Sequence, residues 1–154
     1  MEVYRLTRAP HADLLGEGAR LYGGRWNAAG APAVYAAATR ALAALEYLVH
    51  VDVEDVPDDL VLLTIAVPDG LRETVITAGA LAAEAPDWAA AAAHPACRRA
   101  GDAWLAAGAT LALRVPAVPV PEEQNVVLNP RHPAMRDVRV VARRGFTYDP
   151  RLLG

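Results

Sequence analysis

The stretch Gly23-Gly24-Arg25-Trp26-Asn27 places a guanidinium group, a large aromatic ring and an amide directly after a pair of glycines. Glycine adopts backbone conformations that other residues avoid, so glycine pairs favour turns and the boundaries of strands. We therefore expect Arg25, Trp26 and Asn27 to lie on a turn or at the start of a strand.

A strand and a helix are predicted directly after this stretch. Ala33-Val34-Tyr35-Ala36 is a short apolar run typical of a buried strand, and it carries a second aromatic side chain. Residues 39–49 follow a helical pattern, and Thr39 at their beginning is a residue type that caps helices through its hydroxyl oxygen. The chain is thus predicted to pass from a turn through a strand into a helix.

Glu46 has an unusual position on the predicted helix. At about 100° per residue, Leu42, Leu45 and Val49 form one apolar stripe, and Glu46 lies roughly 40° from Leu42, at the edge of that stripe. A carboxylate that faces the core needs a partner or a chemical role. Two interpretations stay open: an ion pair with an arginine at the margin of the core, or a catalytic or ligand-binding carboxylate.

Composition limits the classes of protein to which the chain can belong. The 154 residues suit a single domain over 1–154, with 54% hydrophobic and 21% charged residues. The net charge of −3 argues against direct contact with nucleic acid over the whole surface. The single cysteine, Cys97, excludes an internal disulfide and fits a reducing cytoplasm. The N-terminus does not resemble a signal peptide, and no apolar run reaches the ~18 residues that a membrane helix needs.

Many short strands and a few helices are predicted along the chain, which favours an α+β fold. Residues 11–20 are interpreted as a loop, residues 52–59 as a solvated acidic loop, and residues 78–93 as short helices. No metal site is expected, because His94 and Cys97 lack further ligands. Besides residues 33–36, strands are predicted at Val3–Leu6, Leu60–Val67, Thr74–Ile76, Leu111–Pro116, Asn125–Pro130 and Val138–Val141.

Five polar residues from distant parts of the chain have side chains suited to one reaction. They are Arg5, Arg25, Tyr35, Glu46 and Asn125. Two arginines can hold phosphates, a tyrosine can stack on a flat ring, and a buried carboxylate can stabilise a developing oxocarbenium cation. Together these groups would suit cleavage of an N-glycosidic bond in a nucleotide.

The sequence resembles the RES-domain family, the toxin halves of bacterial Xre–RES toxin–antitoxin modules. The resemblance implies a fold related to ADP-ribosyltransferases and diphtheria-type toxins, built on a split antiparallel sheet with flanking helices. It implies an activity that consumes NAD as a substrate, and a helix-turn-helix antitoxin of the Xre type that binds DNA and covers the active site. The matching stretches are Tyr4–Leu6, Gly23–Asn27, Val34–Ala36, Ala43–Glu46, Gly101–Leu105, Val115–Pro116, Asn125–Pro130, His132–Pro133 and Tyr148–Leu152.

The resemblance also assigns roles to individual residues. The family's arginine and glutamate match Arg25 and Glu46, while Arg5, Tyr35 and Asn125 match further positions of the pocket. The family serine that follows Val-Pro is replaced here by Ala117, which offers no hydroxyl to a ligand. The expected mechanism has the arginines on the pyrophosphate of NAD, Tyr35 beside the nicotinamide and Glu46 on the nicotinamide ribose.

Three functions remain open from the sequence. They are cleavage of NAD with water or phosphate as acceptor, transfer of ADP-ribose to a protein, and an inactive module that only binds its antitoxin. Ala117 favours the third function, whereas the intact set of Arg25, Tyr35 and Glu46 disfavours it. No cofactor besides the substrate NAD and no membrane partner is expected, and the sequence leaves open a homodimer or a larger toxin–antitoxin assembly.

Overall fold

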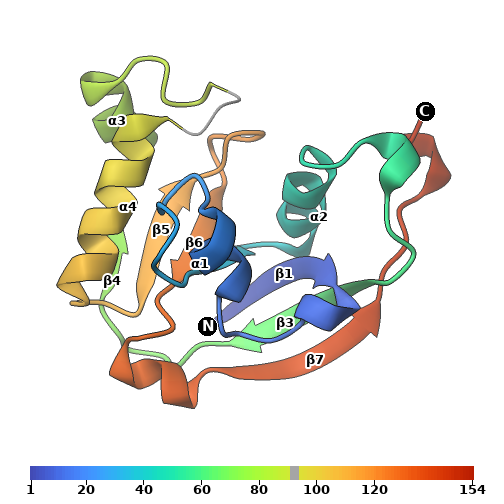
Figure 1. Cartoon of the computed structure of the whole chain (residues 1–154), viewed down its shortest axis with the longest axis horizontal. Coiled ribbons are helices and arrows are strands. Elements are labelled where there is room, and N and C mark those ends of the chain that lie inside the picture. Colours follow the sequence, from blue (N-terminus) through green and yellow to red (C-terminus); the bar gives the residue numbers. More distant parts are fainter. Residues whose placement is uncertain (91–93) are drawn as a thin grey trace.

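Seven strands form one sheet in the computed structural model, which describes residues 1–90 and 94–154 (Figure 1). The elements in chain order are β1 (Glu2–Arg8), η1 (Ala9–His11), α1 (Glu17–Tyr22), β2 (Val34–Ala37), α2 (Arg40–Leu48), η2 (Val53–Asp55), β3 (Leu60–Ala66), β4 (Glu73–Val75), α3 (Ala78–Glu84), α4 (Pro95–Ala107), β5 (Ala112–Pro116), β6 (Gln124–Leu128), η3 (Pro133–Asp137), β7 (Arg139–Gly145) and η4 (Pro150–Leu152).

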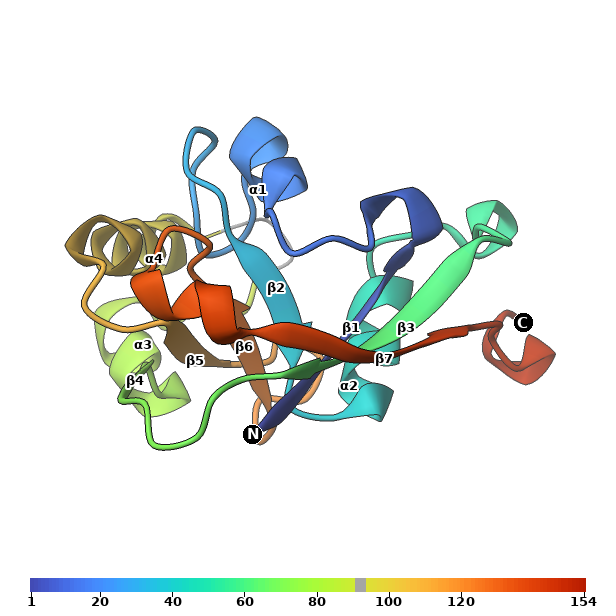
Figure 2. The same cartoon turned by 90° about the horizontal axis from the view of Figure 1, so that it is seen from below.

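The strand order is β4-β5-β6-β2-β1-β3-β7. All neighbouring strands are antiparallel except β4 and β5, which are parallel. At the middle of the sheet, β1 and β2 pair through Tyr4 and Ala37 alone among the described residues, and the two strands then diverge (Figure 2). The sheet therefore consists of two halves joined by a narrow junction.

The long helices cover one face of the sheet. Leu42 and Ala43 of α2 pack with Leu6 and Ala37, while α4 packs with the neighbouring half of the sheet. Tyr35 and Ala37 belong to these two clusters and are two residues apart on β2, so both clusters lie on one face. Ala19 of α1 packs against the same cluster as Trp104 of α4, so α1 also adjoins this face.

The opposite face is covered by short segments instead of long helices. Val3, Leu63 and Ile65 form its core, and residues of η1, the loop after it and η3 pack against them. Strand β3 supplies side chains to both faces, which explains why its sequence Leu60–Ala66 is almost uninterruptedly apolar.

The structure confirms the α+β class and every predicted strand, with boundaries shifted by a few residues. Thr39 caps α2 as predicted, because its Oγ1 accepts a hydrogen bond from Leu42 N at 3.1 Å. Two expectations were wrong. Helix α1 occupies the end of the segment predicted as a loop, and the parallel pair β4–β5 makes the sheet mixed.

Two further expectations concern helices. Helix α3 lies within the alanine-rich segment 78–93, as predicted, although residues 91–93 are outside the described part of the chain. Within the described residues, no helix has the length and apolar character required to cross a membrane.

Candidate functional site

The glycine pair forms a tight turn, as its sequence predicts. Gly23 ends α1 with a φ of 72°, a value that favours glycine, and its N–H donates to Ala19 O at 2.8 Å. Gly24 N donates to Asn27 O at 2.9 Å and closes the turn. A side chain at Gly24 would collide with the hydroxyl of Tyr35, since a Cβ there would lie 2.6 Å from that oxygen.

Asn27 is the polar centre of this turn, although its side chain is fully buried. Its Nδ2 donates to the backbone oxygens of Ala19, Ala28 and Ala31 at 2.9, 3.0 and 3.2 Å. Its Oδ1 accepts a hydrogen bond from the hydroxyl of Tyr35 at 2.7 Å. Both ends of the amide are therefore used to hold the loop against β2.

Tyr35 has its hydroxyl committed to the same turn. The oxygen accepts from Trp26 N at 3.0 Å in addition to donating to Asn27. Burial raises the pKa of the Tyr35 hydroxyl above its ordinary value, so this group keeps its proton at neutral pH. The structure thus gives Tyr35 a clear supporting role, and the residue as a whole is half-buried.

Helix α4 holds the other side of the turn. A Cβ built on Gly101 would lie 1.8 Å from Trp26 O, so only glycine permits this approach of helix and turn. The next residue, Asp102, accepts a hydrogen bond from Ala28 N at 2.9 Å through Oδ1. These two supports were not recognised as such from the sequence, although a glycine followed by an acid inside a helix was the available signal.

Arg25 leaves the turn and binds a second segment of the chain. Its Nη1 donates to Trp88 O and its Nη2 to Ala90 O, both at 3.0 Å. These two contacts use two of the five N–H donors of the guanidinium. Arg25 therefore fixes the segment that follows α3.

Glu46 and Asn125 meet across the junction between α2 and β6. Asn125 Nδ2 donates to Glu46 Oε1 at 2.5 Å, and both residues are half-buried. Glu46 forms no ion pair within residues 1–90 and 94–154, so the described structure does not support the arginine-paired interpretation. The buried Oδ1 of Asn125 accepts no hydrogen bond from the described residues.

Arg5 does not face Glu46. It lies between Tyr4 and Leu6 on β1, and because those two residues pack toward α2, Arg5 belongs to the opposite face. There its Nη1 donates to Asp13 O at 2.8 Å. Burial lowers the pKa of the Arg5 guanidinium, yet an arginine keeps its charge at neutral pH. The expectation that both arginines sit beside one carboxylate is corrected accordingly.

Ala117 is fully buried in the apolar cluster under α2, together with Leu42 and Tyr148. Its side chain is therefore not exposed at the surface of this structure, and its place among the substrate contacts stays a prediction. Of the sequence-predicted residues, the structure joins Glu46 with Asn125, ties Arg25 and Tyr35 to the glycine turn, and separates Arg5 from both groups.

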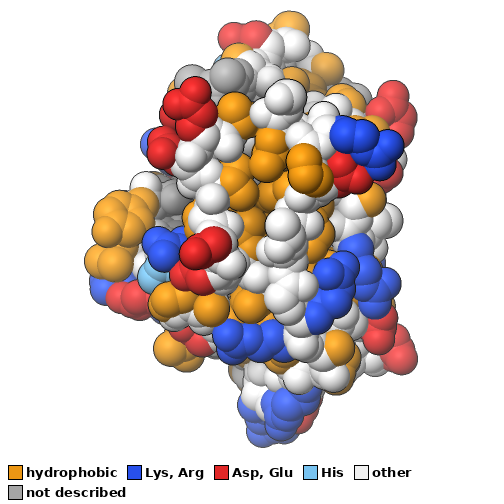
Figure 3. All heavy atoms as spheres, turned by 90° about the vertical axis from the view of Figure 1, so that its right-hand side faces the viewer, with side chains coloured by type: hydrophobic (Ala, Val, Ile, Leu, Met, Phe, Trp, Pro, Cys, Tyr) orange, Lys and Arg blue, Asp and Glu red, His pale blue; other side chains and the backbone are white. Residues whose placement is uncertain are grey.

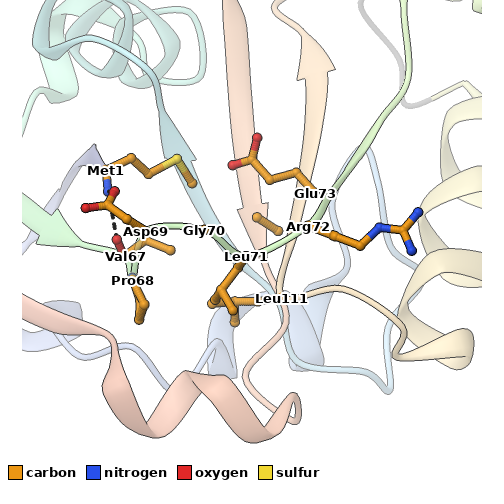
Figure 4. A pocket seen from close by; sticks show the side chains of 10 residues that line it. Met1, Val67, Pro68, Asp69, Gly70, Leu71, Arg72, Glu73 and Leu111 are labelled. Carbon is orange, nitrogen blue, oxygen red and sulfur yellow. Dashed lines mark hydrogen bonds and ion pairs between the residues drawn. The ribbon is translucent and has the colours of Figure 1, made fainter.

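Two hollows lie outside this set. One pocket of about 220 Å³ lies beside the N-terminus. There the Met1 amine is 2.5 Å from Asp69 Oδ1. Figure 4 shows this pocket, and the Arg72 side chain extends away from the other residues that line it. The other, about 340 Å³, lies between residues 28–32 and α4. Neither hollow is lined by Glu46 or Asn125. Across the described residues, no group of three or more His, Cys, Asp or Glu is placed to hold a metal ion.

Comparisons with known proteins converge on one family. The model of the RES domain family matches residues 2–149. A protein of Sphingobium sp. (strain YBL2) described as a Prs ADP-ribosylating toxin is 40% identical, over 92% of this chain and 87% of its own. A protein of Photorhabdus laumondii subsp. laumondii described as Toxin Res is 36% identical, over 99% of this chain and 97% of its own.

A solved structure has a similar fold. It is a chain in the crystal structure of the M. tuberculosis MbcT–MbcA toxin–antitoxin complex, with a TM-score of 0.79 and 24% identity. The similarity covers 99% of this chain and 86% of the other. At this level of identity the likeness concerns the fold.

Proposed function

The chain belongs to the RES domain family, and from this premise we propose that it is the toxin of a toxin–antitoxin pair that consumes NAD by cleaving the bond between nicotinamide and ribose. Relatives described as toxins support the first part of this proposal. The residues around Glu46 support the second part, together with the likeness to an ADP-ribosylating toxin.

The observation that carries the proposed chemistry is the pair formed by Glu46 and Asn125. The asparagine amide orients the carboxylate through Oε1, and the carboxylate has no ion-pair partner within the described residues that would neutralise it. A fixed negative charge stabilises a cation that develops next to it in the transition state. When nicotinamide leaves, the ribose becomes such an oxocarbenium cation.

The Oδ1 of Asn125 is a further hydrogen-bond acceptor beside the Glu46 carboxylate. Its buried Oδ1 lacks a donor among the described residues, and a buried acceptor without a donor is costly. A ligand with hydroxyl groups, such as a ribose, would supply hydrogen bonds to Glu46 Oε2 and to this oxygen. The free acceptor therefore favours a sugar over an apolar ligand.

The remaining predicted residues take supporting roles in this proposal. Arg25, which two backbone contacts hold in place, binds the pyrophosphate through its guanidinium. Tyr35 flanks the nicotinamide with its ring, while its hydroxyl holds the turn that carries Arg25. Arg5 lies next to the junction of the two sheet halves, and its contribution is to anchor the Asp13 loop that borders this junction.

Transfer of ADP-ribose to a protein is the second candidate, because a 40% identical relative is described as an ADP-ribosylating toxin. Both reactions begin with loss of nicotinamide and differ in the acceptor. Incubation of a cell extract with isotope-labelled NAD distinguishes them: labelled protein indicates transfer, whereas free ADP-ribose or its phosphate indicates hydrolysis or phosphorolysis.

The fold and the partner are part of the same proposal. We expect the two-halved sheet to be a member of the ADP-ribosyltransferase class, and a helix-turn-helix antitoxin to cover the Glu46 region. The crystal structure with the similar fold contains a toxin–antitoxin complex, which supports an antitoxin partner. Co-purification with the product of an adjacent gene would test this part.

Replacement of Glu46 by glutamine is the direct test of the chemistry. Glutamine keeps an oxygen that accepts the Asn125 hydrogen bond but removes the charge, so we expect nicotinamide release to fall by about 10²–10³-fold. Glu54→Gln in η2 is the matched control, because Glu54 is exposed and lies outside the candidate site.

The outcomes separate the candidates. Parent-like NAD loss by Glu46→Gln would refute the role of the carboxylate. If the parent protein itself leaves NAD intact while it still binds its antitoxin, the chain is a binding module, and the enzymatic proposal is wrong.

A further inference from the structure

Strand β7 forms an open edge of the sheet. It pairs with β3 on one side and has no strand on the other within the described residues, and it runs along the lower side of the molecule in Figure 1. All 7 of its residues are exposed. An unpaired strand edge offers backbone N–H and C=O groups to another chain.

The hydrogen bonds show which residues of β7 offer these groups. Phe146 N donates to Leu60 O at 2.9 Å, so Phe146 faces β3, and antiparallel alternation turns Arg144 and Ala142 to β3 as well. Arg143 and Gly145 therefore direct their backbone groups outward. Consistent with this orientation, Gly145 O accepts a hydrogen bond from the side chain of Arg144 at 3.2 Å.

The edge is strongly basic in a protein whose net charge is −3. Arg139, Arg143 and Arg144 occupy three of the seven positions, and the strand contains no acidic residue. None of these three arginines forms an ion pair within residues 1–90 and 94–154. In Figure 3, basic side chains gather in the lower half of the molecule, below an apolar central area.

We propose that β7 binds an extended, acidic segment of a partner protein, which adds to the sheet as an eighth strand beside Ala142–Gly145. Backbone groups of Arg143 would pair with the segment, and its carboxylates would meet Arg143 and Arg144 on the two faces. The bulge between Thr64 and Ile65 limits regular pairing toward Arg139, so the contact is short.

Charge distinguishes this partner from a second copy of the chain. Two copies joined through β7 would bring three arginines against three arginines at strand spacing, where like charges repel. An acidic segment instead receives attraction from guanidinium groups that form no ion pair within the described residues. Val141, which is 54% exposed, lies directly before the paired stretch and offers apolar contact at its end. The proposal is independent of the reaction at Glu46.

Titration of the isotope-labelled protein with a peptide tests the proposal by NMR. The probe is an end-capped seven-residue peptide of valine and glutamate with two adjacent glutamates at its centre. We expect amide shifts confined to residues 139–145, and slower hydrogen exchange of the Arg143 amide. The double change Arg143→Glu and Arg144→Glu should weaken binding at least tenfold, whereas Arg72→Glu and Arg99→Glu, which alter exposed arginines elsewhere, should not.

Backbone pairing is tested separately from charge. Arg143→Ala keeps the outward N–H, while Arg143→Pro removes it without breaking a bond to β3, so the proline variant should bind more weakly than the alanine variant. Thermal unfolding of every variant verifies that the fold persists.

Several results would overturn the proposal. A lysine peptide of the same length that binds equally well would exclude charge recognition, and a short DNA duplex that binds more tightly than the acidic peptide would assign the edge to nucleic acid. If the acidic peptide does not bind, the arginines serve only to keep the edge from pairing.

Discussion

Buried polar groups differ in their hydrogen bonding between the turn at Gly23–Asn27, called the glycine turn, and the pair formed by Glu46 and Asn125. In the turn, the amide of Asn27 and the hydroxyl of Tyr35 use their polar atoms on neighbouring backbone and on each other. In the pair, one contact orients the carboxylate, while the buried Oδ1 of Asn125 has no donor among the described residues. A network whose polar atoms all have hydrogen-bond partners stabilises the fold. A buried acceptor without a donor is instead a candidate contact for a ligand.

This difference teaches that residues close together in a sequence motif can have separate tasks. The resemblance to the family groups Arg25, Tyr35 and Glu46 together, yet Tyr35 is built into the support of the turn and Glu46 is not. Changes in the turn should therefore lower the free energy of unfolding, and changes in the pair should lower the rate.

Gly101→Ala should have the largest effect on stability. The added Cβ would meet the backbone oxygen of Trp26, which cannot yield without moving the turn, so we expect a loss of about 3 kcal/mol in the free energy of unfolding. Gly79→Ala is the control: Gly79 also lies in a helix, has open space around it, and should gain up to about 1 kcal/mol. Urea denaturation measures both, and equal effects would show that α4 does not press on the turn.

Tyr35→Phe should cost about 2 kcal/mol, since Asn27 Oδ1 and Trp26 N both lose a buried partner. The ring remains, so the activity of the folded protein should change little if Tyr35 serves the nicotinamide through its ring. Tyr22→Phe, at an 86% exposed position, should be neutral. A variant of parental stability that has lost its activity would instead assign the hydroxyl to the chemistry.

Asn125→Ala should affect the rate more than the stability. Without the amide, the Glu46 carboxylate loses its orientation, and we expect kcat to fall about tenfold, equivalent to ~1.4 kcal/mol. The free energy of unfolding should stay near the parental value, because the change also removes an acceptor for which the described residues supply no donor. Steady-state kinetics with NAD separate kcat from KM, and a change in KM alone would contradict the orienting role.

Ala117→Ser should have the smallest effect. The hydroxyl would enter an apolar cluster, so we expect a loss of about 1 kcal/mol in stability and an unchanged rate of NAD loss. Ala29→Ser, in an exposed loop, controls for the substitution itself. A rise in NAD loss or in toxicity would mean that Ala117 disables the protein and that the serine reaches the substrate.

Local patterns predicted much of this fold. Alternating or continuous apolar residues located the strands, and Thr39 located the start of α2. The helix α1 was missed because its six residues contain two exposed apolar side chains and no buried face, so its sequence has no helical stripe. The parallel pair β4–β5 was missed because strand direction depends on the path of the chain between strands.

The sequence predicted residues for the candidate site but not their arrangement in space. Helical spacing placed Glu46 at the edge of an apolar stripe, residue chemistry added Asn125 to the candidate set, and the structure brings the two together. The same reasoning placed Arg5 beside them, although the alternation along β1 turns it to the other face. The resemblance to the family added Ala117 to the expected contacts, whereas the structure buries its side chain under α2.

The sequence by itself determined the class of fold, the turn at Gly23-Gly24, the cap at Thr39 and the inward-facing edge position of Glu46, because these depend on interactions within a few residues of the chain. Only the tertiary structure decided that Asn125 and not an arginine meets Glu46, that Gly101 touches Trp26, and that β7 is left as a basic edge. Those contacts join residues far apart in the sequence, and the packing of the whole sheet fixes which of them form.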